Sequence, residues 1–173
     1  MIRKIAVIVT AFFISGCGSS IISDGEYSVE NVNFLANDID VGESVRTEIF
    51  FQTKTEFDGA ADGVQVVVKI SSALRYLPGS SEIYDDSTED SDSRSPDQVV
   101  TCPDGSTYLF YNFDDSELDD RSLVGSFDFG FKIEVFGVSR TRSAVISASA
   151  AENQQFSCFS DFEDEESDSI EVK

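Results

Sequence analysis

The chain has 173 residues, with 33 acidic residues against 12 basic ones, a formal net charge of −21 at pH 7 and no histidine. This charge repels the phosphates of nucleic acids, so we expect no nucleic-acid partner. The lack of histidine excludes the Ser-His-Asp and Cys-His catalytic systems, and the acidic residues crowd together instead of pairing as in glycosidases, so we expect no enzyme.

The first 17 residues have the order of a secretory signal. Residues 1–4 are a short cationic start, and residues 5–14 form an apolar run broken by a single threonine. Small residues at 15–16 then precede Cys17. This order predicts a signal that is cleaved before the cysteine. The alternative, an uncleaved membrane helix, is disfavoured because the apolar run is too short for a good span.

With a cysteine directly after the cleavage point, this segment resembles a bacterial lipoprotein signal with its lipobox. The resemblance implies that residues 1–16 are a lipoprotein signal peptide and that Cys17 is acylated, so a lipid anchors the protein to the membrane. Residues 17–25 would then form the lipidated cysteine and a tether. Gly18 stands where inner-membrane lipoproteins of enteric bacteria often carry Asp, so the outer membrane is the expected location within the bacterial cell envelope.

Residues 26–173 have the pattern of one all-β domain. Apolar and polar residues alternate in short runs separated by turn signals such as Asp58-Gly59, and no segment holds a helical period for three turns. The predicted strands lie at 27–34, 45–51, 64–70, 99–100, 108–113, 127–138, 142–150 and 170–172. Seven or eight such strands predict an antiparallel β-sandwich.

The clearest alternation is in the strand at 127–138. The residues expected on its buried face are Phe127, Phe129, Phe131, Ile133 and Val135, and Lys132 is expected on the exposed face. Three other aromatic residues, Phe50, Phe136 and Phe162, fall on the opposite face of strands or in loops. We favour edge packing for them over a binding stripe.

The order of these segments carries a second resemblance. An apolar strand at 63–70 leads to Leu-Pro-Gly-Ser at 77–80, and an irregular polar stretch precedes the alternating strand at 127–135 and the segment 144–150. This order is similar to that of the immunoglobulin-like repeat modules of bacterial surface proteins, a family of unknown function. The resemblance spans residues 42–172 in a single copy and implies an immunoglobulin-like β-sandwich.

Two cysteines remain once Cys17 is lipidated. In an exported chain they are most simply explained by one disulfide, between Cys102 and Cys158. The alternative is a pair of free, buried thiols. A structural zinc site is not expected, because two cysteines without a histidine do not make a ligand set.

Acidic residues gather in three clusters between predicted strands, at 85–92, 114–120 and 161–168. We favour solvated, self-repelling loops as the explanation. The alternative is a weak calcium site, because such loops can wrap Ca²⁺ with affinities of about 10⁻⁴–10⁻³ M. Its ligands would be Asp161, Asp164, Glu165 and Asp168.

Together these features predict a non-catalytic, lipid-anchored envelope protein that binds or braces another envelope or surface protein. No cofactor is expected apart from a weakly bound Ca²⁺. The alternative function is a calcium-dependent adhesion or glycan-binding module that uses the acidic loops.

Overall fold

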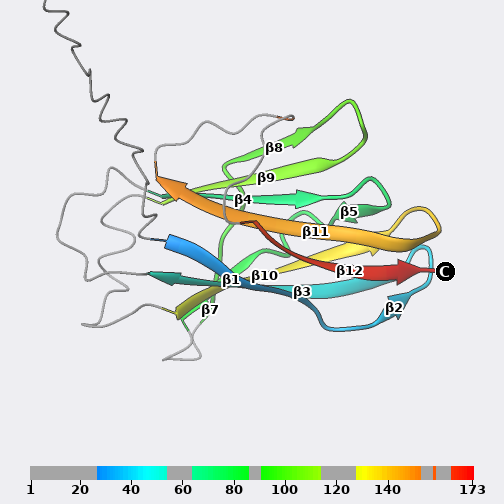
Figure 1. The fold of residues 1–173 in the computed structure, drawn as a ribbon, viewed down its shortest axis with the longest axis horizontal. Helices are drawn as coiled ribbons and strands as arrows, with labels where there is room; N and C mark the ends of the chain where they lie inside the picture. Colours follow the sequence, from blue (N-terminus) through cyan, green and yellow to red (C-terminus); the bar gives the residue numbers. More distant parts are fainter. Residues whose placement is uncertain (1–26, 54–63, 86–90, 114–127, 153–157, 159–164) are drawn as a thin grey trace, which may run out of the picture.

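The computed structural model describes residues 27–53, 64–85, 91–113, 128–152, 158 and 165–173. These residues form twelve strands in two sheets that pack face to face (Figure 1). The start of β1 and the C-terminus lie at opposite ends of the sandwich. Within the described ranges, no helix has the length and apolar character needed to cross a membrane.

The first sheet, which we call sheet A, has the order β1-β3-β10-β6-β7, and β5 also pairs with β10. All its pairings are antiparallel. Its strands are β1 (Tyr27–Phe34), β3 (Ser44–Thr53), β5 (Leu74–Tyr76), β6 (Glu82–Asp85), β7 (Ser91–Ser93) and β10 (Asp128–Gly137).

The second sheet, sheet B, has the order β2-β12-β11-β4-β9-β8. Its pairings are antiparallel except for the short parallel contact between β2 and β12. Its strands are β2 (Asp38–Ile39), β4 (Val64–Ile70), β8 (Gln98–Thr101), β9 (Thr107–Phe113), β11 (Thr141–Glu152) and β12 (Glu166–Val172).

The predicted all-β sandwich is confirmed, and each predicted strand has a counterpart in the structure. Four short strands were not predicted, namely β2, β5, β6 and β7. Each has only two to four residues, which is too short for an alternating pattern to be recognised. Their presence explains why the structure has more strands than the seven or eight expected.

Phe131, at the middle of β10, lies where the inner faces of the two sheets meet. Its side chain is completely buried. Its ring centroid lies 5.5 Å from that of Phe51 on the same sheet, and 4.6 and 5.6 Å from those of Tyr111 and Phe113 on sheet B. The predicted inward register of β10 is therefore confirmed at Phe131.

The other residues predicted on the buried face of β10 agree where the structure describes them. Ile133 and Val135 are completely buried, and Lys132, between Phe131 and Ile133, is partly exposed on the opposite face. Phe127 and the side chain of Phe129 lie outside the described part of the chain.

A chain of three hydroxyl groups crosses the core between the sheets. The Ser81 hydroxyl is 2.7 Å from that of Tyr76 on β5 and 2.8 Å from that of Tyr111 on β9. Burial raises the pKa of Tyr111 above its ordinary value, so the group stays a neutral hydroxyl. Because all three oxygens have partners, these polar groups are accommodated in an otherwise apolar core.

Two of the off-face phenylalanines pack against neighbours on the outer face of sheet A. Phe50 meets Tyr84 edge to face at 5.9 Å, and the Arg75 guanidinium lies 5.8 Å from the ring centroid of Phe136. Gly130 lies under Tyr84, since a Cβ there would come within 2.3 Å of the Tyr84 ring. This packing fits the edge-packing interpretation, and the third phenylalanine, at 162, lies outside the described residues.

We predict that Phe131→Ala lowers the free energy of unfolding by about 3–5 kcal/mol, because it empties the centre of the core. Phe136→Ala, the matched change on the outer face of the same strand, should cost about 1 kcal/mol. Denaturant unfolding of both variants measures the difference. Equal losses would show that β10 does not have this register.

Candidate functional site

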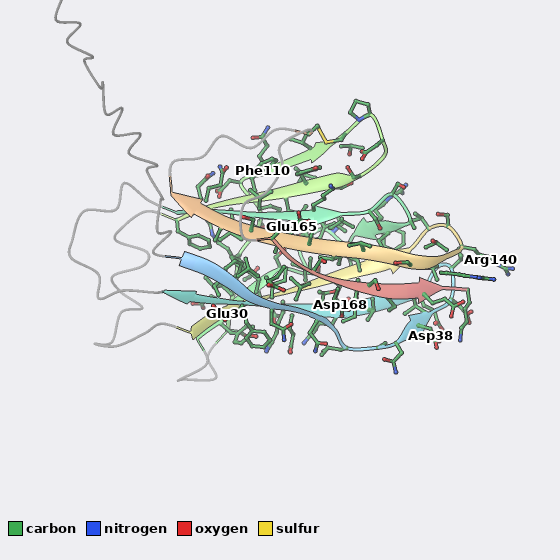
Figure 2. The ribbon with its side chains drawn as sticks, viewed as in Figure 1. Glu30, Asp38, Phe110, Arg140, Glu165 and Asp168 are labelled. Atoms are coloured by element: carbon green, nitrogen blue, oxygen red, sulfur yellow. A yellow bond between two sulfur atoms is a disulfide. The ribbon has the colours of Figure 1, made fainter. Side chains whose placement is uncertain are left out.

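Asp168 is the one predicted calcium ligand whose bonding the structure describes in detail. It was expected in a loop, but it lies in β12 (Figure 2). Its Oδ2 accepts a hydrogen bond of 2.9 Å from the Phe34 N–H, and its Oδ1 accepts one of 2.7 Å from the Ser169 N–H. Asp168 therefore joins β12 of sheet B to β1 of sheet A.

The other acidic residues are only partly described. Glu165 is exposed, whereas Asp161 and Asp164 lie outside the described residues, as does the whole cluster at 114–120. Asp85 and Asp92, expected in a loop, belong to strands β6 and β7. In the part of the chain that the structure describes, no three Cys, Asp or Glu side chains are grouped so that they could hold a metal ion.

We predict that Ca²⁺ and Mg²⁺ raise the melting temperature equally at matched ionic strength, because both only screen repelling carboxylates. Thermal melts with each ion measure this. A specific site would instead favour Ca²⁺, since Mg²⁺ demands tight octahedral geometry. A saturable Ca²⁺ shift at micromolar ion that Asp164→Asn with Glu165→Gln abolishes would contradict the screening explanation.

The predicted disulfide is present between Cys102, directly after β8, and Cys158, in the connection between β11 and β12. The two Cα atoms are 5.6 Å apart and the sequence separation is 56 residues. Figure 2 shows the bond in yellow near the end of β8. It fastens the long β11–β12 connection to the edge of sheet B.

A second apolar cluster lies beside this bond, on the outer face of sheet B. Its side chains alternate along β4 and β9 with those that enter the main core, so they point away from sheet A. The buried members are Val67, Cys102, Tyr108 and Phe110, and the partly buried Val100 and Cys158 pack against them. Sheet B is thus apolar on both faces next to β8.

The crossover from β7 to β8 is held by Arg94. Its guanidinium donates a hydrogen bond of 2.7 Å to the Asn112 carbonyl oxygen and lies 3.2 Å from the Asp97 carboxylate. The same Asp97 Oδ2 accepts a hydrogen bond of 2.7 Å from the Asn112 N–H. The Asp97 N–H donates a hydrogen bond of 2.8 Å to the Phe110 carbonyl oxygen. These contacts fix the start of β8 against β9.

The turn from β8 to β9 fixes the other end of β8. Asp104 accepts bonds from both the hydroxyl and the N–H of Ser106, at 2.6 and 3.0 Å. These bonds lower the pKa of Asp104 below its ordinary value. Gly105 has φ of +83°, a conformation that residues with a side chain rarely adopt. β8 is therefore an edge strand that is fastened at both ends.

This region of sheet B carries groups that could contact another molecule. It offers backbone groups at a sheet edge, apolar side chains and two carboxylates that already have partners. Sequence reasoning found the two cysteines but missed Arg94, Asp97 and Asn112. One available signal was an isolated arginine at the end of an acidic run, followed by Ser-Pro-Asp at 95–97.

We predict that replacing both Cys102 and Cys158 with Ala lowers the free energy of unfolding by about 4 kcal/mol, because the closed loop is long. Denaturant unfolding of the double variant beside the wild type measures it. The native mass without reductant should be two protons below the reduced mass. Prompt alkylation of both thiols in the unreduced native protein would contradict the bond.

Comparison of the sequence with protein-family models and with curated proteins finds no match. Comparison of the fold with solved structures finds similar domains in bacterial surface proteins. The N-terminal domain of the Streptococcus gordonii adhesin Sgo0707 matches with a TM-score of 0.54 and 11% identity, over 86% of this chain and 32% of that one.

Two pilus proteins match in the same way. The T6 backbone pilin of serotype M6 Streptococcus pyogenes has a TM-score of 0.53 and 11% identity, over 84% of this chain and 36% of that one. The pilus backbone RrgB of Streptococcus pneumoniae has a TM-score of 0.51 and 9% identity, over 75% and 32%. This chain therefore spans about a third of these proteins' lengths, and at such identity the likeness shows the fold alone.

Proposed function

We propose that this protein is a non-catalytic binding or structural module of the bacterial envelope. A lipid on Cys17 holds it at the membrane. The outer membrane is favoured because Gly18 stands where inner-membrane lipoproteins of enteric bacteria often carry Asp. Its task is to bind or brace another envelope or surface protein.

The observation that carries this proposal is the β-sandwich itself, whose architecture recurs in domains of an adhesin and of pilus backbones. Those proteins have surface and structural roles by their names, and the transfer of such a role to this chain is our inference. Two sequence features support it: the signal at residues 1–17 and the lack of histidine. The disulfide between Cys102 and Cys158 fits an oxidising compartment outside the cytosol.

The geometry favours this function over the calcium-dependent alternative. Asp168, one of the four predicted calcium ligands, already accepts a backbone hydrogen bond on each of its two oxygens. The edge of sheet B beside the disulfide, in contrast, is exposed and fixed in place, as a protein-binding surface requires.

We predict that Cys17→Ser abolishes lipid anchoring, because serine has no thiol to acylate. The wild type should partition into the detergent phase and carry an acyl mass on its mature N-terminus, whereas the variant should remain as precursor or be released as soluble protein. Phase partitioning and intact mass measure both.

Crosslinking in intact envelopes then tests the binding role. The wild type should give a defined crosslinked species, and Cys17→Ser, matched for expression, should lose it because it is no longer held beside its partner. A wild type without any acyl mass would refute the anchor. Failure of the anchored protein to crosslink to any envelope protein would refute the binding role.

A further inference from the structure

β8 is the outermost strand of sheet B, and alternate residues of it turn their backbone groups away from the sheet. Cys102 donates its N–H to the Ser106 carbonyl at 2.8 Å, so these two residues form a hydrogen-bonded pair. Bonded and non-bonded pairs alternate along an antiparallel ladder. With the register of β8 against β9, the N–H and C=O groups that point outward belong to Val99 and Thr101.

The side chains of the same two residues are exposed. Val99 is 52% exposed although it lies opposite Leu109, which is buried in the main core. Val99 therefore stands on the inner, apolar face of sheet B at its rim. A strand added at this edge would bond to the outward groups and bury Val99 beside its own side chains.

The other edge strands offer less. β2 has two residues and β7 has three, Ser-Asp-Ser. β1 lies against β11 and β12 of the opposite sheet. Natural edges are usually protected by Lys, Pro, inward charges or such coverage, but β8 reads Gln-Val-Val-Thr and carries none of these residues.

β8 is also fixed before any partner arrives. Its start is held through Arg94 and Asp97, and its end through the disulfide at Cys102 and the Asp104 turn. A strand that is already ordered loses little conformational entropy when another strand pairs with it.

The charge around the edge indicates the kind of partner. Exposed Asp97, which is paired with Arg94, and exposed Asp104 lie one at each end of β8, and the chain as a whole carries −21. A second copy would bring the same carboxylates together in an antiparallel pairing, which is repulsive. A segment with basic residues on both sides of a β-branched centre is complementary to this edge.

From these observations we propose that β8 is a docking strand: it accepts an extended, basic segment of another protein as an added strand of sheet B. The inference rests on the proposed function and assigns to it a surface and a partner chemistry. It is an instance of recognition by strand addition, in which main-chain bonds give affinity and side chains give specificity.

Two synthetic peptides test the proposal directly. Both have a Thr-Val-Thr-Val-Thr centre; one has lysines at both ends and the other glutamates. Amide exchange followed by NMR should slow at Val99 and Thr101 with the lysine peptide, while Gln98 and Val100, already bonded to β9, change little. At low salt, the glutamate peptide should bind at least about tenfold more weakly than the lysine peptide.

Matched variants locate the binding edge. Val99→Lys places a charge on the docking edge and should weaken binding of the lysine peptide about tenfold or more. Val41→Lys is the control, because Val41 is 48% exposed and follows β2, at the opposite edge of sheet B. It should leave affinity within about twofold. Asp104→Asn, which keeps an oxygen to accept from Ser106, should reduce the preference for lysine over glutamate ends.

The envelope crosslink separates failure of this inference from failure of the proposed function. Loss of the crosslinked species in Val99→Lys, but not in Val41→Lys, supports docking at β8. An equal crosslink in wild type and Val99→Lys, or peptide binding that protects Val100 rather than Val99, overturns the docking strand and leaves the binding role standing. If anchored wild type gives no crosslink at all, the binding role itself fails.

Discussion

The contact of Phe131 with aromatic rings from both sheets is the interaction on which this structure depends. β10 lies in the interior of sheet A and pairs with β3, β5 and β6. A shift of its register by one residue would send Phe131 to solvent and bring Lys132 into the core. Because three strands take their positions from β10, that error would spread through the whole sheet.

Sheet B is built differently around β9. Leu109 and Tyr111 enter the main core, while Tyr108 and Phe110 are buried on the outer face. This explains the continuous aromatic run in that part of the sequence, since a strand buried on both sides does not alternate. The disulfide lies over this outer face. β8 is the edge strand of the sheet beside it, so the same part of sheet B carries both the second apolar cluster and the exposed edge.

Much of the fold could be predicted from the sequence, because its long strands alternate clearly. In β3, for example, Val45, Thr47, Ile49 and Phe51 occupy alternate positions of the sequence and are all buried. The disulfide could be predicted from cysteine count and the export signal. The bond between Phe34 and Asp168 could not, because the two residues are 134 positions apart and only the finished sandwich brings them together. The contacts of Arg94 and Asp97 with Asn112 were missed because Asn112 lies 15–18 positions further along the chain and reaches them only when β8 pairs with β9.

The opposite placement of the start of β1 and the C-terminus has a mechanical consequence (Figure 1). Tension applied between Tyr27 and Lys173 runs along the strands, not across them. The ladders that join β1 to β3 and β12 to β11 would then be loaded in shear. Their hydrogen bonds would share the force instead of breaking one after another. A module pulled in this direction resists extension through its backbone pairing, whatever the identity of the protein that pulls on it.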